Sequence, residues 1–198
     1  MVPSGVAVRR FSVDEYHRLI QEGYFAADER YELLDGLIVH KMSRDPIHDA
    51  AMEIADDVLR SRLPAGWRVR VQCAITTADS EPEPDLVIVR GRPVDHVARH
   101  PGPQELAIVV EVANTFLADD RTVKGLLYAR ASIGVFWIIN LIDRRVEVYT
   151  DPSEPDSAPA YRRREDFVAG QAVPLMIGGV AVAPVPVAEL LPPVPQST

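Results

Sequence analysis

The sequence predicts a mixed α/β domain in which helices flank a central mixed β-sheet. Two apolar runs, at 85–89 and 105–112, lack polar alternation, which indicates strands that are covered on both faces. Segments with apolar residues at helical spacing precede and follow these runs, and that order implies a layered domain. No glycine-rich phosphate loop follows a predicted strand, which disfavours a nucleotide-binding fold.

Composition limits the architecture and the cellular setting. The 198 residues are 47% hydrophobic and 25% charged, which predicts one globular domain over 1–198. The single cysteine, Cys73, excludes an internal disulfide and a cysteine-rich zinc site. No apolar run approaches the roughly 20 residues of a membrane-spanning helix, so we expect a cytoplasmic protein. The net charge of −8 disfavours broad, sequence-blind binding of nucleic acid.

Two short elements are predicted near the N-terminus. Ser12 and Glu15 form a capping box that opens a helix, and Gly23 can end this helix in a left-handed conformation. Short apolar segments on either side of Asp35 and Gly36 then predict an N-terminal β-hairpin, because Asp-Gly favours a two-residue turn.

A long helix and a half-buried strand follow. Apolar residues recur at helical spacing over 46–63, and Pro46 occupies a plausible first-turn position. The stretch 67–75 alternates strictly between apolar and polar residues, which predicts a strand with one covered face. Arg70 and Gln72 belong to the polar face of this strand.

The second half of the chain is predicted to contain another helix, a hairpin and short C-terminal elements. These segments are a helix over 119–132, a hairpin over 135–150, a loop rich in Pro, Ser and Asp over 151–160, short strands or a strand and a turn over 161–191, and a flexible tail over about 192–198.

Each central apolar run carries one carboxylate, Asp85 in the first and Glu111 in the second. A carboxylate in a dry strand needs a partner, a proton or a metal. If the two strands pair in antiparallel fashion, the start of the first lies beside the end of the second, and the carboxylates become neighbours. A hard divalent ion such as Mg²⁺, for which Mn²⁺ can substitute, would remove their repulsion.

Lys124 supplies a third candidate group. Of the 21 lysines and arginines, only Lys41 and Lys124 are lysines, which raises the question of whether an arginine would fail at 124. On the predicted helix, Lys124 shares a side with Asp120 and Tyr128 and points toward the sheet. A compact ammonium near the ion can orient or deprotonate an attacking water and stabilise charge on a phosphate.

These residues resemble a known family. Pro84-Asp85, the strand that carries Glu111, and the segment "DDRTVKGLLYARASIGVFWIIN" are similar to the PD-(D/E)XK nuclease superfamily, and more closely to its bacterial branch of restriction-endonuclease-like proteins without an assigned substrate. The resemblance spans the chain from about 11 to 191. It implies a restriction-endonuclease-like core, Asp85 and Glu111 as metal ligands, a catalytic lysine, a lesser role for Glu32, and a place beside the site for Gln72.

One position departs from the superfamily pattern. Two residues after Glu111, where the strand lysine normally stands, the chain has Ala113. In this branch the lysine has moved to the following helix, which fits Lys124. Catalysis therefore depends on that migrated lysine, whereas a metal site could survive without it.

The leading hypothesis is a Mg²⁺-dependent endonuclease that hydrolyses phosphodiester bonds in nucleic acid, with DNA as the expected substrate. Asp85 and Glu111, aided by the backbone carbonyl of Val112, hold the ion. Lys124 helps to activate water, and Glu32 tunes the site. Arg70 and Gln72 contact the substrate, and we expect a homodimer.

Other readings stay open. Asp85 could simply cap its strand, and Glu111 and Lys124 could form a buried ion pair, with Asp120 as a helical partner of the lysine. The main alternative is an inactive nuclease-fold protein that serves as a dimeric scaffold through the hairpin 135–150. A glycosidase is disfavoured because it gives Lys124 no role. Surface or capping duty is expected for His48.

Overall fold

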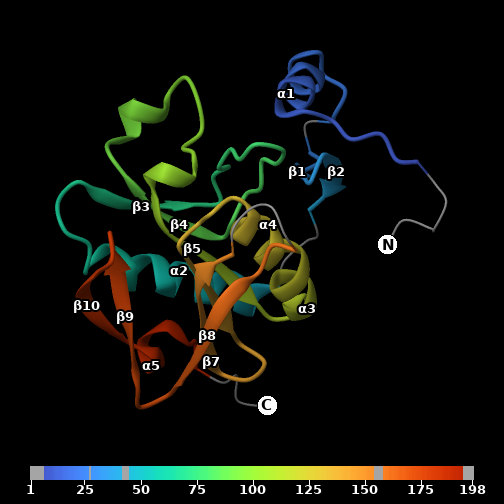
Figure 1. Ribbon diagram of the computed structural model, residues 1–198. Coiled ribbons are helices and arrows are strands. Elements are labelled where there is room, and N and C mark those ends of the chain that lie inside the picture. Colours follow the sequence, from blue (N-terminus) through green and yellow to red (C-terminus); the bar gives the residue numbers. More distant parts are fainter. Residues whose placement is uncertain (1–6, 27, 42–44, 154–157, 194–198) are drawn as a thin grey trace.

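The computed structural model describes residues 7–26, 28–41, 45–153 and 158–193. Its centre is a six-stranded sheet with the order β3-β4-β5-β6-β7-β8 (Figure 1). Strands β5 and β6 pair in parallel, and the other neighbours pair in antiparallel fashion, so the predicted mixed sheet is confirmed. The six strands are β3 (Trp67–Val71), β4 (Leu86–Arg90), β5 (Leu106–Ala113), β6 (Val135–Asn140), β7 (Arg145–Pro152) and β8 (Tyr161–Val168).

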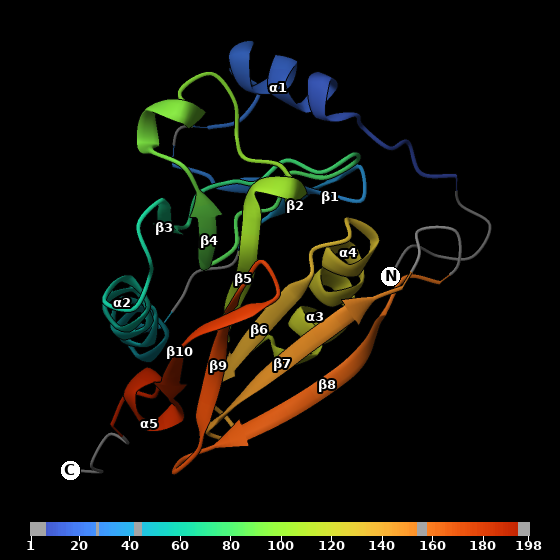
Figure 2. The same cartoon turned by 60° about the vertical axis from the view of Figure 1, so that its left-hand side comes forward.

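Different elements cover the two faces of this sheet. Helix α2 (Pro46–Arg60), helix α5 (Val187–Leu190) and the hairpin of β9 (Ala172–Ile177) and β10 (Val180–Pro186) pack on one face. Helix α4 (Gly125–Arg130) packs on the other face. Figure 2 shows α2 and α5 together on one side of the sheet and α4 on the other. Because successive strand residues point to opposite faces, both layers need apolar residues, which explains the runs without alternation.

The N-terminal elements agree with prediction. Helix α1 (Val13–Gln21) begins with the Ser12–Glu15 capping box. Strands β1 (Tyr31–Leu34) and β2 (Leu37–His40) form the hairpin, whose turn residues Asp35 and Gly36 both have positive φ, as a two-residue turn requires. Helix α1 and this hairpin lie at the end of the molecule opposite β9 and β10 (Figures 1 and 2).

The strand predicted over 67–75 is shorter than expected, since β3 ends at Val71. Gln72 has a φ of 48°, and this left-handed conformation turns the chain out of the sheet. The backbone N–H of Ile75 then donates to the carbonyl of Pro82 instead of continuing the ladder. The prediction was based on the alternation of apolar and polar side chains. This alternation continues past Val71 even though the backbone changes direction there.

The helix predicted over 119–132 is interrupted. It consists of a short turn α3 (Leu117–Asp119), a π-helical turn η3 (Asp120–Lys124) and α4. A π turn is wider than an α turn, so it rotates the residues that follow relative to those that precede it. Val123, within this turn, is 48% exposed.

The remaining segments agree in outline. The loop between β4 and β5 contains the 3₁₀ turns η1 (Pro93–His96) and η2 (Pro103–Glu105). Strands β8, β9 and β10 occupy most of 161–186, and helix α5 follows them. Residues 154–157 of the predicted polar loop and 194–198 of the predicted flexible tail lie outside the described residues. No helix in the described part of the chain has the length and apolar character needed to cross a membrane.

Candidate functional site

Asp85 stands at the start of β4 and is held by two elements. Its Oδ2 accepts hydrogen bonds from the backbone N–H of Val112 on β5, at 2.9 Å, and from Nε2 of His48 on α2, at 3.1 Å. The residue is 7% exposed. Burial raises the pKa of Asp85, but the hydrogen bond and charge of His48, with Lys124 and Val112, outweigh burial and lower it to about 2. Asp85 is therefore an anion at neutral pH.

Glu111 lies on the neighbouring strand. Leu86 pairs with Val110 in the antiparallel β4–β5 register, so the residues one step beyond this pair, Asp85 and Glu111, are brought side by side as predicted. The Glu111 side chain is directed to the α4 face, where Oε1 accepts from the hydroxyl of Tyr128 at 2.6 Å. The residue is 1% exposed.

The charge of Glu111 is only partly balanced. Its Oε2 lies 2.9 Å from Nζ of Lys124. Burial raises the pKa of Glu111, Lys124 opposes that rise, and the charges of Asp85 and Asp120 add to it, which brings the value to about 8. One ammonium thus serves three neighbouring carboxylates, and the site retains an excess of negative charge.

The π-helical turn η3 brings Lys124 and Asp120 to the same place. Lys124 Nζ lies 3.7 Å from Oδ1 of Asp120, in addition to its contact with Glu111. Burial lowers the pKa of Lys124, but Glu111 and Asp120 raise it more strongly, so the lysine is charged. Burial also raises the pKa of Asp120, to about 6. Lys124 therefore forms both of the ion pairs considered as alternatives, one with Glu111 and one with Asp120, at the same time.

Glu32 of β1 reaches the loop that leads into β4. Its Oε2 accepts from the backbone N–H of Glu83 at 3.1 Å, and the residue is 6% exposed. Glu32 is therefore not a solvent-facing residue of the hairpin. Its contact fixes the backbone two residues before Asp85, and its charge contributes to the raised pKa of Lys124.

Arg70 and Gln72 lie one strand further out. Arg70 pairs with Val87, whose side chain belongs to the α4 face, so Arg70 shares the sheet face of Glu111. The backbone N–H of Gln72 donates to the carbonyl of Asp85 at 3.0 Å. Gln72 thus adjoins Asp85 through its backbone, and Arg70 lies on the neighbouring strand β3.

His48 was undervalued from sequence. The expected cap exists, because Asp45 accepts from the His48 backbone N–H, but the imidazole itself contacts Asp85. Asn114, just after β5, donates to Asp45 at 2.6 Å and ties the start of α2 to the end of that strand. The signal that could have indicated this contact was the place of His48 in the N-terminal turn of a helix directed at the strand ends. How α2 packs against β4 could not be inferred from that signal.

The donor set suits a hard divalent cation. Asp85 and Glu111 offer carboxylate oxygens, and the negative charge left around Lys124 favours a second cation. No three His, Cys, Asp or Glu side chains within the described ranges are arranged to hold a metal. An ion bound here would therefore complete its shell with backbone carbonyls and water, which Mg²⁺ commonly does. The N–H of Val112 donates to Asp85.

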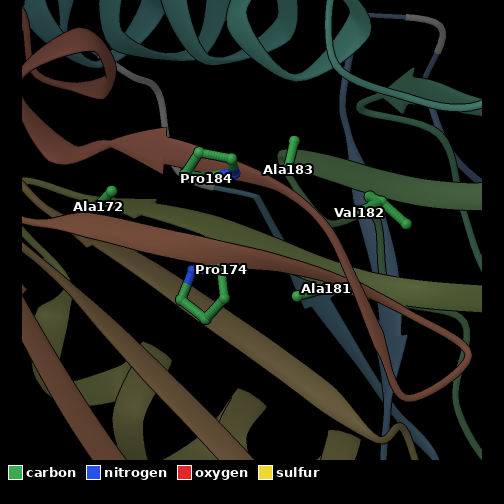
Figure 3. A pocket seen from close by; sticks show the side chains of 6 residues that line it. All are labelled: Ala172, Pro174, Ala181, Val182, Ala183 and Pro184. Carbon is green, nitrogen blue, oxygen red and sulfur yellow. The ribbon is translucent and has the colours of Figure 1, made fainter.

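The hairpin expected to serve a scaffold dimer has a buried strand. Trp137, Ile138 and Ile139 are fully buried within the sheet, so these three side chains are not available for a contact with another chain. An apolar hollow lies elsewhere, on the hairpin of β9 and β10 (Figure 3). It offers no titratable group, since its lining side chains are Ala172, Pro174, Ala181, Val182, Ala183 and Pro184.

Comparisons with known proteins agree with this geometry. The Uma2 family model, described as "Putative restriction endonuclease", matches residues 13–183. The fold is similar to the crystal structure of a putative nuclease belonging to DUF820 from Anabaena variabilis, with a TM-score of 0.68, 16% identity, and coverage of 91% of this chain and 97% of that chain. No curated protein matches the chain. The fold is of the restriction-endonuclease-like PD-(D/E)XK type, and the chain belongs to the Uma2 family.

Proposed function

We propose that this chain is a divalent-cation-dependent endonuclease that hydrolyses phosphodiester bonds in nucleic acid, with DNA as its expected substrate. Membership of a restriction-endonuclease family and the likeness of the fold to that of a nuclease support this activity. The observation that carries the proposal is the convergence of Glu111 and Lys124, 2.9 Å apart, beside an ionised Asp85. Purely structural ion pairs do not require two carboxylates and an ammonium at one sheet edge.

Asp85 and Glu111 are the proposed ligands of Mg²⁺ or Mn²⁺, with the carbonyl of Val112 as a further oxygen donor. When bound, the ion would supply a Lewis acid that offsets charge on the phosphoryl oxygens and lowers the pKa of a water. His48 and the N–H of Val112 orient Asp85 through its Oδ2. Such contacts hold a ligand carboxylate in one orientation.

Lys124 is the proposed catalytic ammonium. Its raised pKa means that it donates hydrogen bonds, so it can orient the attacking water and stabilise negative charge that develops on the phosphate. Glu32 acts indirectly, because its bond to the Glu83 N–H holds the segment before Asp85. Arg70 and Gln72 are the proposed substrate contacts.

We further propose a cytoplasmic homodimer. The single Cys73 is compatible with a reducing compartment. A two-fold symmetric dimer would present two sites to the two strands of a duplex, which is the simplest way for a nuclease of this size to cut both. The net charge of −8 implies that contacts with phosphates are local rather than spread over the surface.

Substitution of Lys124 tests the assignment. Lys124→Ala is expected to reduce cleavage of plasmid and oligonucleotide DNA in Mg²⁺ or Mn²⁺ by about 10²-fold or more, the usual effect of losing one such group. Lys124→Arg should also be impaired, because a planar guanidinium does not fit a buried ammonium site. Arg130→Ala, on the same helix but 42% exposed, is the matched control and should cleave normally. Unchanged cleavage by Lys124→Ala would remove the lysine from the mechanism.

Ala113 favours a second candidate, an inactive nuclease-fold binding protein, because the strand position of the superfamily lysine holds no functional group. Calorimetric titration with Mn²⁺ separates the two candidates. A nuclease should bind the ion, and Asp85→Asn should abolish this binding. An inactive binding protein has no need for the ion, so absence of binding together with absence of cleavage would favour it.

A further inference from the structure

A pocket of about 270 Å³ lies beside the candidate site, between the end of β3, helix α1 and the loop before β5. Asp85 and Glu111 do not line this pocket. The backbone N–H of Gln72 in its wall nevertheless donates to the carbonyl of Asp85. Its polar lining includes Tyr16, Arg70, Gln72, Glu81, Glu83 and His100.

Two hydrogen-bond donors in this wall are buried without a partner. Nη1 of Arg70 and Nε2 of Gln72 are inaccessible to solvent and have no acceptor among the described residues. Oε1 of Gln72 has only a long contact of 3.5 Å with Arg30. Because an unpaired buried donor is unfavourable, a rotation of either side chain toward the pocket that brings its donor onto an acceptor of a ligand would be stabilising.

The opposite polar groups are acceptors. Glu81 is 4% exposed and is held by His17 at 2.8 Å and by Thr76 at 2.7 Å. Glu83 accepts from Arg30 at 2.7 Å and is more accessible than Glu81. Two carboxylates would repel a phosphate, whereas a neutral ring with both acceptors and N–H donors suits such a mixed lining.

The pocket lies within reach of a nucleic-acid strand at the carboxylates. Arg70 on β3 shares the sheet face of Glu111 on β5. Two strand spacings separate β3 from β5, which is roughly 10 Å, or about three nucleotide steps of a stacked strand. A base that is paired within a duplex cannot enter a pocket, so the ligand must be unpaired or flipped out.

We propose that this pocket binds one unpaired nucleobase of the substrate, with Arg70 and Gln72 donating to its acceptors and Glu83 accepting from its N–H groups. Guanine matches best, because its O6 and N7 accept from arginine while its N1–H and N2–H₂ groups can donate to a carboxylate. This inference rests on the proposed nuclease function and narrows the substrate to nucleic acid with an unpaired position near the cleaved bond.

Fluorescence anisotropy with Ca²⁺ in place of Mg²⁺ tests the pocket. The probes are a fully paired DNA duplex, the same duplex with one bulged guanine, and the same duplex with an abasic bulge. The wild-type protein should bind the guanine bulge about tenfold more tightly than the abasic bulge. Arg70→Met and Gln72→Leu should each remove most of that preference, so that the variants bind the guanine bulge and the abasic bulge about equally.

Arg68→Met is the matched control, because Arg68 lies on the same strand and face but outside the pocket, with its Nε on the carbonyl of Gly91. It should keep the guanine preference. Equal weakening of all three probes by Arg70→Met would make Arg70 a phosphate contact and overturn the inference, as would a wild-type protein that does not distinguish guanine from the abasic position. Cleavage of the guanine-bulge duplex in Mg²⁺, measured in parallel, separates failure of the pocket from failure of the nuclease function.

Discussion

Glu111 and Glu147 occupy one row of the sheet, on β5 and β7, and each is the pairing partner of Ile138 on the strand between them. Both are buried, at 1% and 0% exposure. Their surroundings differ. Glu147 accepts from Nε of Arg121 at 2.9 Å, Nδ2 of Asn140 at 2.7 Å and the hydroxyl of Tyr149 at 2.8 Å. Glu111 has one ammonium and one hydroxyl.

The pKa values express this difference. Burial raises the pKa of Glu147, but Arg121, Asn140 and Tyr149 outweigh burial and lower it to about 2. For Glu111 burial prevails, and the pKa rises to about 8. The fold itself balances the charge of Glu147, which is therefore a structural group, whereas the neighbours of Glu111 do not balance its charge, and an external cation could take the place of its proton. A buried carboxylate indicates a functional site only when the residues around it do not balance its negative charge.

Removal of the Glu147 charge should have the largest effect on stability. Glu147→Gln leaves Arg121 without its buried counterion, so we expect a loss of roughly 2–3 kcal/mol in the free energy of unfolding, measured by urea denaturation. Glu165→Gln, on the exposed face of β8, is the control and should change stability by less than about 0.5 kcal/mol. An equal effect of the two substitutions would end the distinction between Glu147 and an ordinary surface carboxylate.

The contributions of Glu111 and Glu147 to the free energy of unfolding should depend on pH in opposite directions. The folded state raises the pKa of Glu111 from about 4.5 to about 8, so this residue stabilises the protein below pH 4.5 and loses that contribution as pH rises through 8. The lowered pKa of Glu147 contributes stability above pH 4.5, and this contribution is lost as pH falls toward 2. Urea denaturation from pH 5 to 9 should show a decline of up to about 1.4 kcal/mol per pH unit. Glu111→Gln should flatten this decline, and an unchanged slope would contradict the assignment.

Binding of a metal ion should depend on the same proton. A divalent cation requires ionised Glu111, so affinity for Mn²⁺ should rise by up to about tenfold per pH unit below pH 8 and level off above it. Calorimetry in two buffers of different ionisation enthalpy should report release of close to one proton. Binding without proton release would mean that the ion does not engage Glu111.

An exposed ion pair on the same helix should have the smallest effect. Arg130 contacts Asp35 at 2.7 Å, with both side chains more than 40% exposed. Arg130→Ala should therefore cost less than about 1 kcal/mol, and 0.5 M salt should reduce even this difference. A larger loss in thermal denaturation would show that the contact between α4 and the β1–β2 turn has a greater structural role than its exposure suggests.

Much of the fold was accessible from local sequence pattern. The capping box, the Asp35-Gly36 turn and the two doubly covered strands were all predicted, because each depends on residues close together in the chain. The antiparallel pairing that brings Asp85 beside Glu111 was assumed in the prediction, and the register of β4 and β5 agrees with it. The π turn at 120–124 was missed, because no residue type marks it and α-helical spacing was assumed throughout.

The sequence by itself determined where strands, helices and buried carboxylates would occur. It singled out Glu111, but it did not show that Glu147 is equally buried or that the charge of Glu147 is balanced by the fold. That distinction came from Arg121 and Lys124, two residues of one helical segment that reach different strands. It was decided by the tertiary structure because the free energy of a buried charge depends on distances to groups remote in the chain, whereas backbone periodicity depends on neighbouring residues.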